Sequence, residues 1–344
     1  GTLAELAAYE YVADNGRGGL GTVILQAAGN VKALANFDLL NSLRYEINVA
    51  ATDKDGTVTF YSNFGSSILV AAPAASVTTD VSGTGGYNDA AGSEGDMTTD
   101  FGGTSAACPV TAGVVALMLD AESNLGWRDV QQILATSARM AGSAIGLDAK
   151  YEVSDPHFQQ MLVNNGNLAE QGGDTWNDGG RYYSGDYGFG TVDAFAAVRL
   201  SEVWRLIHAT PQTSANEQMT RVTANPGLAL NAVAGSTTVY ELTVAAGMEV
   251  ENIDLTLSVH FSVDDPVNET WLIRLVSPTG SIYDITYDDA LLLTDDPSYD
   301  PAIGEGFSYH ANDANGLTWT FGVAQVLGES SGGTWRVEFL NQTQ

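Results

Sequence analysis

Short apolar runs alternate with helical stretches through the first 207 residues of the chain. Three of these runs have an apolar centre and end abruptly in a loop: TVILQAAGN, EINVAATD and SILVAAPA. Strands of a parallel sheet have this pattern, because both of their faces are buried. Helical spacing predicts a helix that ends near residue 13 and further helices at about 104–121, 127–138 and 191–207. Strands that alternate with helices predict an α/β layer fold.

The pattern changes after residue 207. Residues 208–220 are polar and without periodicity, which predicts a linker. Six short alternating segments follow, each broken by Gly, Pro, Asn or Asp: TTVYELTVA, ENIDLTLSVHFS, ETWLIRLVSP, SIYDITY, LTWTFGVAQVL and GTWRVEFLN. This alternation predicts an all-β sandwich of the jelly-roll type. We therefore expect an α/β domain over 1–207, a linker over 208–220 and a β-sandwich over 221–344.

The chain is strongly acidic, with 42 acidic against 13 basic residues and a formal net charge of −29. Such a charge disfavours nucleic acid and anionic membranes as partners. It fits a protein kept soluble in a salty medium, where the self-repulsion is screened, and it equally fits a protein that binds Ca²⁺. Three acidic segments carry enough carboxylates for Ca²⁺, although ordinary solvated loops explain them as well: 172–180, 262–270 and 286–300.

Two further features bound the cellular context. No uninterrupted apolar run approaches the ~18 residues that a membrane-spanning helix needs, so the sequence predicts no membrane span. The first residues show no basic stretch followed by an apolar one, so no signal peptide is visible. Cys108 is the single cysteine, which excludes a disulfide framework and predicts a small packed residue.

One segment combines glycines, a proline and a long apolar run: GGTSAACPVTAGVVALMLDAE. Gly102 and Gly103 free the backbone for a tight turn. Pro109 suits the first turn of a helix, where its missing N–H is not needed, and the apolar run after it predicts a buried helix. Ser105 then lies at the start of this helix among unpaired N–H groups. It is either a helix cap or a nucleophile beside donors that stabilise negative charge.

Asn30 follows the first predicted strand, in the sequence AAGN. By itself it is typical of a turn residue, because asparagine tolerates left-handed backbone. Together, AAGN and GGTSAACP resemble the oxyanion-hole and nucleophile blocks of subtilisin-like serine proteases. The resemblance implies that Ser105 attacks the scissile carbonyl, and that its own N–H and the Asn30 side-chain amide hold the oxyanion. It also implies that Ala28, Gly29 and Thr104 adjoin the substrate.

Longer blocks resemble the kexin and proprotein-convertase branch: GRGGLGTVILQAAGN, TSAACPVTAGVVALMLDAESNLGWRDVQQILATSA and TWNDGGRYYSGDYGFGTVDAFAAV. The later segments RLVSPTGS and WTFGVAQVLGESSGGTWRVEF resemble the P domain that follows the catalytic domain in that branch. The match covers nearly the whole chain. It implies a partial subtilisin-like parallel-sheet domain followed by a jelly-roll P domain, a polypeptide substrate and structural Ca²⁺.

Part of the expected catalytic machinery is absent from the chain. In this family the triad runs in the order Asp, His, Ser. All four histidines follow Ser105, and none has an HGT-like setting: His157, His208, His260 and His310. We therefore expect the later part of a catalytic domain, which lacks the base and its orienting carboxylate. Its partner would be the upstream part of the same domain, without which it is inactive.

Two positions bear on specificity and metal binding. Asp38 lies where convertases place a carboxylate that pairs with a basic substrate side chain, although an ordinary surface aspartate explains it equally well. Asn63 stands where they have a calcium-ligating glutamate, so that site is weakened and the metal ligands stay unknown. We expect a secreted or extracellular endopeptidase, with the periplasm as an alternative, that cleaves after basic residues. A subtilisin-type protease of non-basic specificity and a non-catalytic binding protein are the alternatives.

Overall fold

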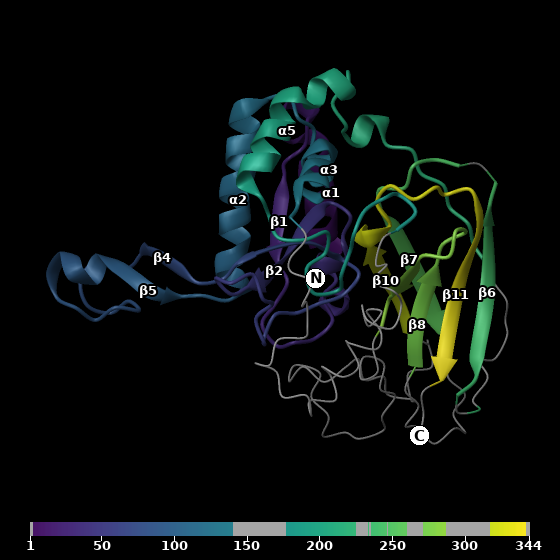
Figure 1. Ribbon diagram of the computed structural model, residues 1–344, viewed down its shortest axis with the longest axis horizontal. Helices are drawn as coiled ribbons and strands as arrows, with labels where there is room; N and C mark the ends of the chain where they lie inside the picture. The colour runs from purple at the N-terminus through teal and green to yellow at the C-terminus, as the bar shows by residue number, and fades with distance from the viewer. Residues whose placement is uncertain are drawn as a thin grey trace.

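The computed structural model describes residues 3–139, 177–224, 233, 235–245, 247–259, 271–286 and 317–341. An α/β part is built from the described residues up to Ile207, and sheets built from the last third of the chain lie beside it (Figure 1). The division of the chain into domains at the expected places stays a prediction. Three of the four histidines, His157, His260 and His310, fall outside the described residues. Most of the three acidic segments also falls outside them.

The three apolar runs form a parallel sheet with the strand order β1-β2-β3. β1 spans Ile24–Ala27, β2 spans Glu46–Thr52 and β3 spans Ile68–Pro73. Every residue of β2 is buried, because helices cover one face of the sheet and the loops that follow β1 lie over the other. The mixed α/β prediction is confirmed for this part of the chain.

The longest helix, α2, spans Thr104–Ala121 and packs across this sheet. It begins directly after Gly103, whose φ of 81° lets the chain turn into the helix. Because the helix begins at Thr104, Pro109 lies in its second turn, and the prediction of a first-turn proline is wrong. The missing N–H of Pro109 therefore leaves the carbonyl of Ser105 without its usual partner in the helix.

α2 bears on the expectation that the chain has no membrane span. It has 18 residues and a mean hydropathy of 1.4, so by length and composition alone it could cross a membrane. A helix in the core of a soluble protein passes the same test. Val114, Val115 and Met118 of α2 are packed into the core cluster that includes the sheet, so the finding is weak support for a span.

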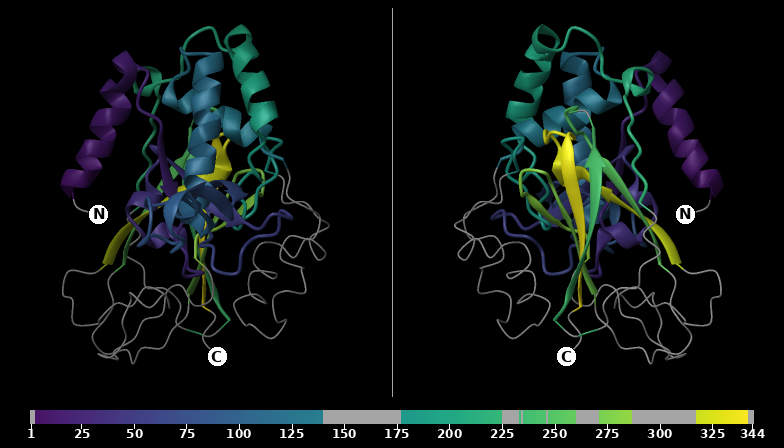
Figure 2. Two further views of the ribbon diagram at one scale, coloured as in Figure 1. Left: turned by 90° about the vertical axis from the view of Figure 1, so that its left-hand side faces the viewer. Right: turned by 90° about the vertical axis from the view of Figure 1, so that its right-hand side faces the viewer.

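Three more helices complete the α/β part: α1 (Leu3–Asn15), α3 (Trp127–Ser137) and α5 (Ala194–Ile207). α5 packs on both α2 and α3, and α1 stands at the outside of this part (Figure 2). Asp193 caps α5 by accepting the N–H of Ala196, and the helix therefore begins at Ala194 and not at residue 191. A hairpin of β4 (Ser76–Thr79) and β5 (Met97–Phe101) projects from the body (Figure 1).

The predicted β segments after residue 236 all form strands: β6 (Thr237–Val244), β7 (Ile253–Val259), β8 (Trp271–Val276), β9 (Ile282–Asp284), β10 (Leu317–Val323) and β11 (Gly333–Asn341). Four of them make an antiparallel sheet in the order β6-β11-β8-β9, and β10 pairs with β7. Side chains from both sheets share one apolar cluster, which includes Ile273, Phe321 and Val337. We call these two sheets the C-terminal sheets; their jelly-roll topology stays a prediction.

Candidate active site

The loop after β1 carries Asn30 out of the sheet. The N–H of buried Ala28 still donates to the carbonyl of Val49 at 3.0 Å, as a continuation of the strand. Gly29 then adopts a φ of 108°, and a Cβ at this position would lie 2.4 Å from Nδ2 of Asn63. Only glycine meets both conditions without strain. Asn30, the next residue, is exposed.

Asn63 fixes the shape of this loop. Its Oδ1 accepts the N–H groups of Val31 and Ala33 at 3.0 and 3.1 Å, and its own N–H donates to the carbonyl of Gly29 at 3.0 Å. The amide oxygen that was considered as a calcium ligand is thus engaged by two backbone donors. We assign Asn63 to holding the Asn30 loop.

Ser105 is exposed in the first turn of α2. The N–H groups of Ala106 and Ala107 turn back to the carbonyl of Gly103, at 2.9 and 3.3 Å. The N–H of Ser105 has no such partner among the described residues, as is normal at the start of a helix. The helix dipole adds partial positive charge at the same point, so negative charge is favoured beside Ser105.

Thr104 joins the two segments. Its N–H and its hydroxyl both donate to Oδ1 of Asn30, at 2.9 and 3.0 Å, and its hydroxyl accepts the N–H of Gly29 at 3.2 Å. The structure therefore brings Asn30 next to the residue that precedes Ser105. Thr104 is fully buried and Ala28 nearly so, so their side chains are not exposed to a substrate. Contact of either residue with a substrate would have to come from its backbone.

The exposed hydroxyl of Ser105 and two donors belong to this part of the fold: the N–H of Ser105 itself, and Nδ2 of Asn30, whose oxygen is bound by the preceding residue, Thr104. Such a group can receive the oxyanion of an attacked carbonyl. A base for the hydroxyl is not supplied by His208, which is the single histidine in the described parts of the chain. The imidazole of His208 stacks on Trp204 with ring centroids 4.4 Å apart, and its Nδ1 lies 3.2 Å from Gln212. That environment is structural, as predicted.

Asp38 lies between two short 3₁₀ turns, η2 (Ala35–Phe37) and η3 (Leu40–Ser42). Its side chain is exposed, and its Oδ1 accepts the N–H of Leu40 at 2.9 Å. This bond fixes the local turn but leaves the second carboxylate oxygen available. Both interpretations of Asp38, as a ligand for a basic group and as a turn residue, fit this geometry.

Glu46 is a feature that the sequence analysis missed. It opens β2 and is buried, and its carboxylate oxygens lack a hydrogen bond of good geometry within the described part of the chain, although the hydroxyl of Tyr9 interacts with them. Burial, and after it the negative charge of Asp38, raise the pKa of Glu46 to about 8, and the hydroxyl of Tyr9 lowers it only in part. A glutamate at the start of the apolar run EINVAA is the signal that could have drawn attention to it.

Cys108 lies one turn beyond Ser105 and is half-buried. Burial raises the pKa of the thiol, and the charge of Glu46 adds to this effect. The thiol is therefore held in its neutral form, which is the unreactive one. The geometry agrees with the interpretation of Cys108 as a packed residue.

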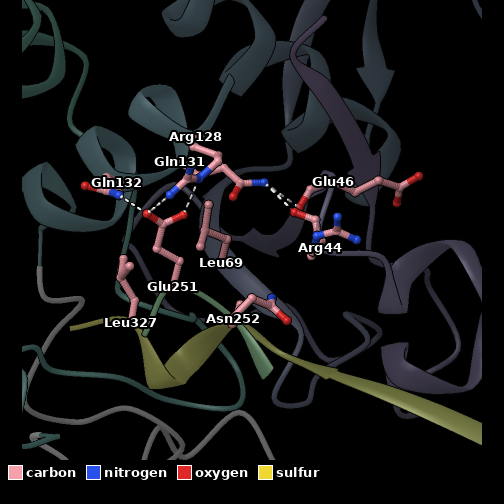
Figure 3. Close-up of a pocket in the computed structure, with 10 residues that line it drawn as sticks. Arg44, Glu46, Leu69, Arg128, Gln131, Gln132, Glu251, Asn252 and Leu327 are labelled. Atoms are coloured by element: carbon pink, nitrogen blue, oxygen red, sulfur yellow. Dashed lines mark hydrogen bonds and ion pairs between the residues drawn. The ribbon is translucent and has the colours of Figure 1, made fainter. Parts of the chain in front are cut away.

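A hollow lies between α3 and the C-terminal sheets, away from Ser105 in the sequence (Figure 3). Arg128 and Gln132 point from α3 to the carboxylate of Glu251, and Gln131 points to the backbone carbonyls of Arg44 and Glu46. Within this hollow Arg128 and Glu251 form an ion pair, and Arg44 pairs with Glu217 outside it. We interpret it as a junction that holds the C-terminal sheets to α3. Among the described residues, no group of three or more His, Cys, Asp or Glu side chains is arranged to hold a metal ion.

Comparison with known proteins gives a consistent result. Residues 1–179 match the subtilase family. A calcium-dependent protease of Nostoc sp. is 40% identical over 143 residues, which are 38% of this chain and 22% of that protein. Kexin of Saccharomyces cerevisiae is 27% identical over 330 residues, which are 94% of this chain and 33% of kexin. An extracellular serine protease of Aeromonas sobria is 29% identical over 97% of this chain and 55% of that protein.

The crystal structure of the Aeromonas sobria serine protease superposes with a TM-score of 0.70 and 22% identity. It covers 99% of this chain and 62% of that one, so the two share a fold. The chain spans 22% to 55% of the three curated relatives named above, and each of them is a longer protein.

Proposed function

The chain belongs to the subtilase family, and from this premise we propose that it is the later part of a serine endopeptidase, 1–207, joined by a linker, 208–220, to a P-domain-like β-sandwich, 221–344. The observation that carries the catalytic proposal is the double hydrogen bond from Thr104 to Oδ1 of Asn30. Because these bonds occupy the oxygen of Asn30, its amide nitrogen is the group that we assign to the oxyanion, together with the N–H of Ser105. The likeness to kexin along the chain supports the assignment of the second part.

In this proposal the hydroxyl oxygen of Ser105 attacks the scissile carbonyl carbon as a base takes the hydroxyl proton. The carbonyl oxygen becomes an oxyanion, which the N–H of Ser105 and Nδ2 of Asn30 hold by hydrogen bonds. Expulsion of the protonated amine leaves an acyl-enzyme, and water then releases the acid. The base and its orienting carboxylate belong to an upstream part of the same domain, so this chain alone is inactive.

The substrate is a polypeptide, and we propose that cleavage follows a basic residue. Asp38 is exposed and keeps one carboxylate oxygen available, so it can accept hydrogen bonds from a guanidinium. Relatives named kexin and dibasic-processing endoprotease support a preference of this kind. Their identity to this chain is low, and a subtilisin-type protease of non-basic specificity is the alternative that a comparison of substrates would decide.

We also propose structural Ca²⁺, which two relatives named calcium-dependent protease support. The described residues offer candidate ligands around the start of β2, where buried oxygen atoms lack a hydrogen bond of good geometry: Oδ1 of Asn41, both carboxylate oxygens of Glu46 and Oδ1 of Asn48. Nδ2 of Asn48 bonds the carbonyl of Asn41, and Glu46 and Asn48 lie two residues apart on the same side of β2. Oxygen atoms of this kind are the ligands that Ca²⁺ prefers, and the ion would neutralise Glu46.

The relative called an extracellular protease, together with the acidic surface, supports secretion of this protein. A fluorophosphonate probe, which reacts with activated serines, tests the catalytic proposal on the full-length protein. We expect the probe to label the wild type and Cys108→Ala but not Ser105→Ala, and the wild type to cleave peptides. Equal labelling of the Ser105→Ala variant, or no cleavage at all, would reject the proposal in favour of a non-catalytic binding protein.

A further inference from the structure

Asp38 lies in a loop with little regular structure of its own, residues 34–43, which we call the Asp38 loop. Most of its backbone hydrogen bonds are local turn bonds, such as the N–H of Asp38 to the carbonyl of Ala35 at 3.0 Å and the N–H of Leu43 to that of Leu40, also at 3.0 Å. Bonds of this kind open easily when nothing outside holds the loop. The position of Asp38 therefore depends on the partners of its neighbours.

Asn36, which lies two residues before Asp38, is hydrogen-bonded to the C-terminal sheets. Asn36 is fully buried, and its Nδ2 donates to the carbonyl of Gly322 in β10 at 2.8 Å. The indole N–H of Trp319, also in β10, donates to the carbonyl of Asn36 at 3.0 Å. The two bonds run in opposite directions between the same two segments. They tie the backbone and the side chain of Asn36 to one strand.

The loop is also held on the other side of Asp38. Gly322 lies so close to Ser42 that a Cβ on Gly322 would be 2.3 Å from the carbonyl oxygen of Ser42. The rings of Phe37 and Phe321 meet edge to face with centroids 6.3 Å apart, and Phe37 joins the apolar cluster of the C-terminal sheets. β10 thus touches the Asp38 loop both before and after Asp38.

We infer that β10 of the C-terminal sheets positions the Asp38 loop, and with it the carboxylate that recognises a basic substrate side chain. Trp319 is a positioning residue in this arrangement, because it acts on Asp38 through Asn36. The inference rests on the proposed function for its consequence, the recognition of a basic residue. The placement of the loop by β10 is independent of that function.

Contacts outside the Asp38 loop also hold the α/β part and the C-terminal sheets together. Gln325 donates to the carbonyls of Gly65 and Ser184, and Arg128 binds Glu251. Loss of the Trp319 bond would therefore leave the C-terminal sheets docked and loosen the Asp38 loop alone. This separation makes the inference testable without dismantling the protein.

The test compares Trp319→Phe with Trp335→Phe in the full-length protein. Both tryptophans lie in the C-terminal sheets and donate an indole N–H to a backbone carbonyl, that of Asn36 for Trp319 and that of Ser331 for Trp335. Trp335 is the more buried of the two, so its substitution costs at least as much stability. An effect on the loop that only the first variant shows is therefore not a result of general destabilisation.

Two measurements follow. We expect Trp319→Phe to speed hydrogen exchange at the amides of Asp38, Leu40 and Leu43 by about two- to tenfold, the size of one lost neutral hydrogen bond. We expect a similar rise in KM for an Arg-ending peptide, with kcat unchanged. Gly322→Ala, which pushes β10 away from Ser42, should act in the same direction. Trp335→Phe should change neither quantity.

Unchanged exchange in the loop of both Trp319→Phe and Gly322→Ala would overturn the inference, whatever the kinetics. Equal effects of Trp319→Phe and Trp335→Phe would overturn it as well, since the loop would then respond to stability alone. If the wild type cleaved after Phe as well as after Arg, the proposed specificity would fail. The exchange measurement would still decide whether β10 places the loop.

Discussion

The N–H and the hydroxyl of Thr104 both donate to Oδ1 of Asn30, at 2.9 and 3.0 Å. An amide has one oxygen and one nitrogen, so this pair of bonds also decides where the nitrogen of Asn30 points. The nitrogen lies near Gly103, directly before α2, since a Cβ on Gly103 would be 3.4 Å from it. A buried threonine thereby orients a donor that the proposed chemistry requires on the residue 74 positions earlier.

The first prediction concerns the two residues of this relationship. Asn30→Ala removes the donor itself and should lower kcat by about 10²–10³, the size found for the corresponding donor in subtilisin, which belongs to the same family. Thr104→Val keeps the shape and the N–H bond but loses both bonds of the hydroxyl, to Oδ1 of Asn30 and from the N–H of Gly29. We expect a smaller loss, about tenfold, in kcat with little change in KM. Peptide hydrolysis by the full-length variants measures both, and equal losses would contradict the orienting role of Thr104.

The second prediction concerns substrate charge. Asp38→Asn keeps the turn, because the amide oxygen can still accept the N–H of Leu40, but it removes the negative charge. We expect kcat/KM for an Arg-ending peptide to fall by about 10- to 100-fold, the range for a lost hydrogen bond to a charged group. A Phe-ending peptide is the control and should be cleaved as before. A parallel loss for both peptides would show that Asp38 serves the fold and not recognition.

The third prediction follows from the pKa of Glu46, which burial and Asp38 raise from 4.5 to about 8. The folded state then holds a proton that the unfolded chain releases between these two values, so stability falls as the pH rises through this window. The slope is at most about 1.4 kcal/mol per pH unit. Chemical denaturation in the presence of a chelator, from pH 5 to pH 9, should show this fall for the wild type. A Glu46→Gln variant should show a flatter profile, and identical profiles would exclude Glu46 as the cause.

The fourth prediction concerns Ca²⁺ and the same carboxyl group. If the ion binds the oxygens of Asn41, Glu46 and Asn48, it should raise the melting temperature of the wild type and abolish the pH dependence just described. Glu46→Gln removes the charge and should remove most of the Ca²⁺-induced shift. A shift of equal size in both proteins would place the bound calcium elsewhere.

The fifth prediction concerns Asp129, a fully buried residue of α3. Its two oxygens accept the indole N–H of Trp204 at 2.7 Å and the N–H groups of Gly126 and Gln212 at 2.8 and 3.0 Å. Asp129→Asn turns an amide nitrogen toward at least one of these donors and should lower the free energy of unfolding by about 2–4 kcal/mol. Asp120→Asn, on the exposed side of α2, is the matched control and should change it by less than about 0.5 kcal/mol.

The sequence by itself determined the local elements of this protein. Mostly apolar runs identified β1, β2 and β3, because strands inside a parallel sheet are buried on both faces, and alternation identified the six later strands. The glycine pair Gly102 and Gly103 predicted a tight turn before Ser105, which Gly103 makes with a positive φ. These features depend on neighbours along the chain, and the sequence contains them directly.

Only the tertiary structure decided which distant groups meet. The contact of Thr104 with Asn30, the bond of Trp319 to an Asn36 that lies 283 residues earlier, and the isolation of the Glu46 carboxyl all depend on how separate elements pack. Hydrophobic periodicity states that a face is buried, but it does not specify what lies against that face. Partners of buried polar groups are chosen by packing in three dimensions, and for that reason the functional geometry became visible only in the folded chain.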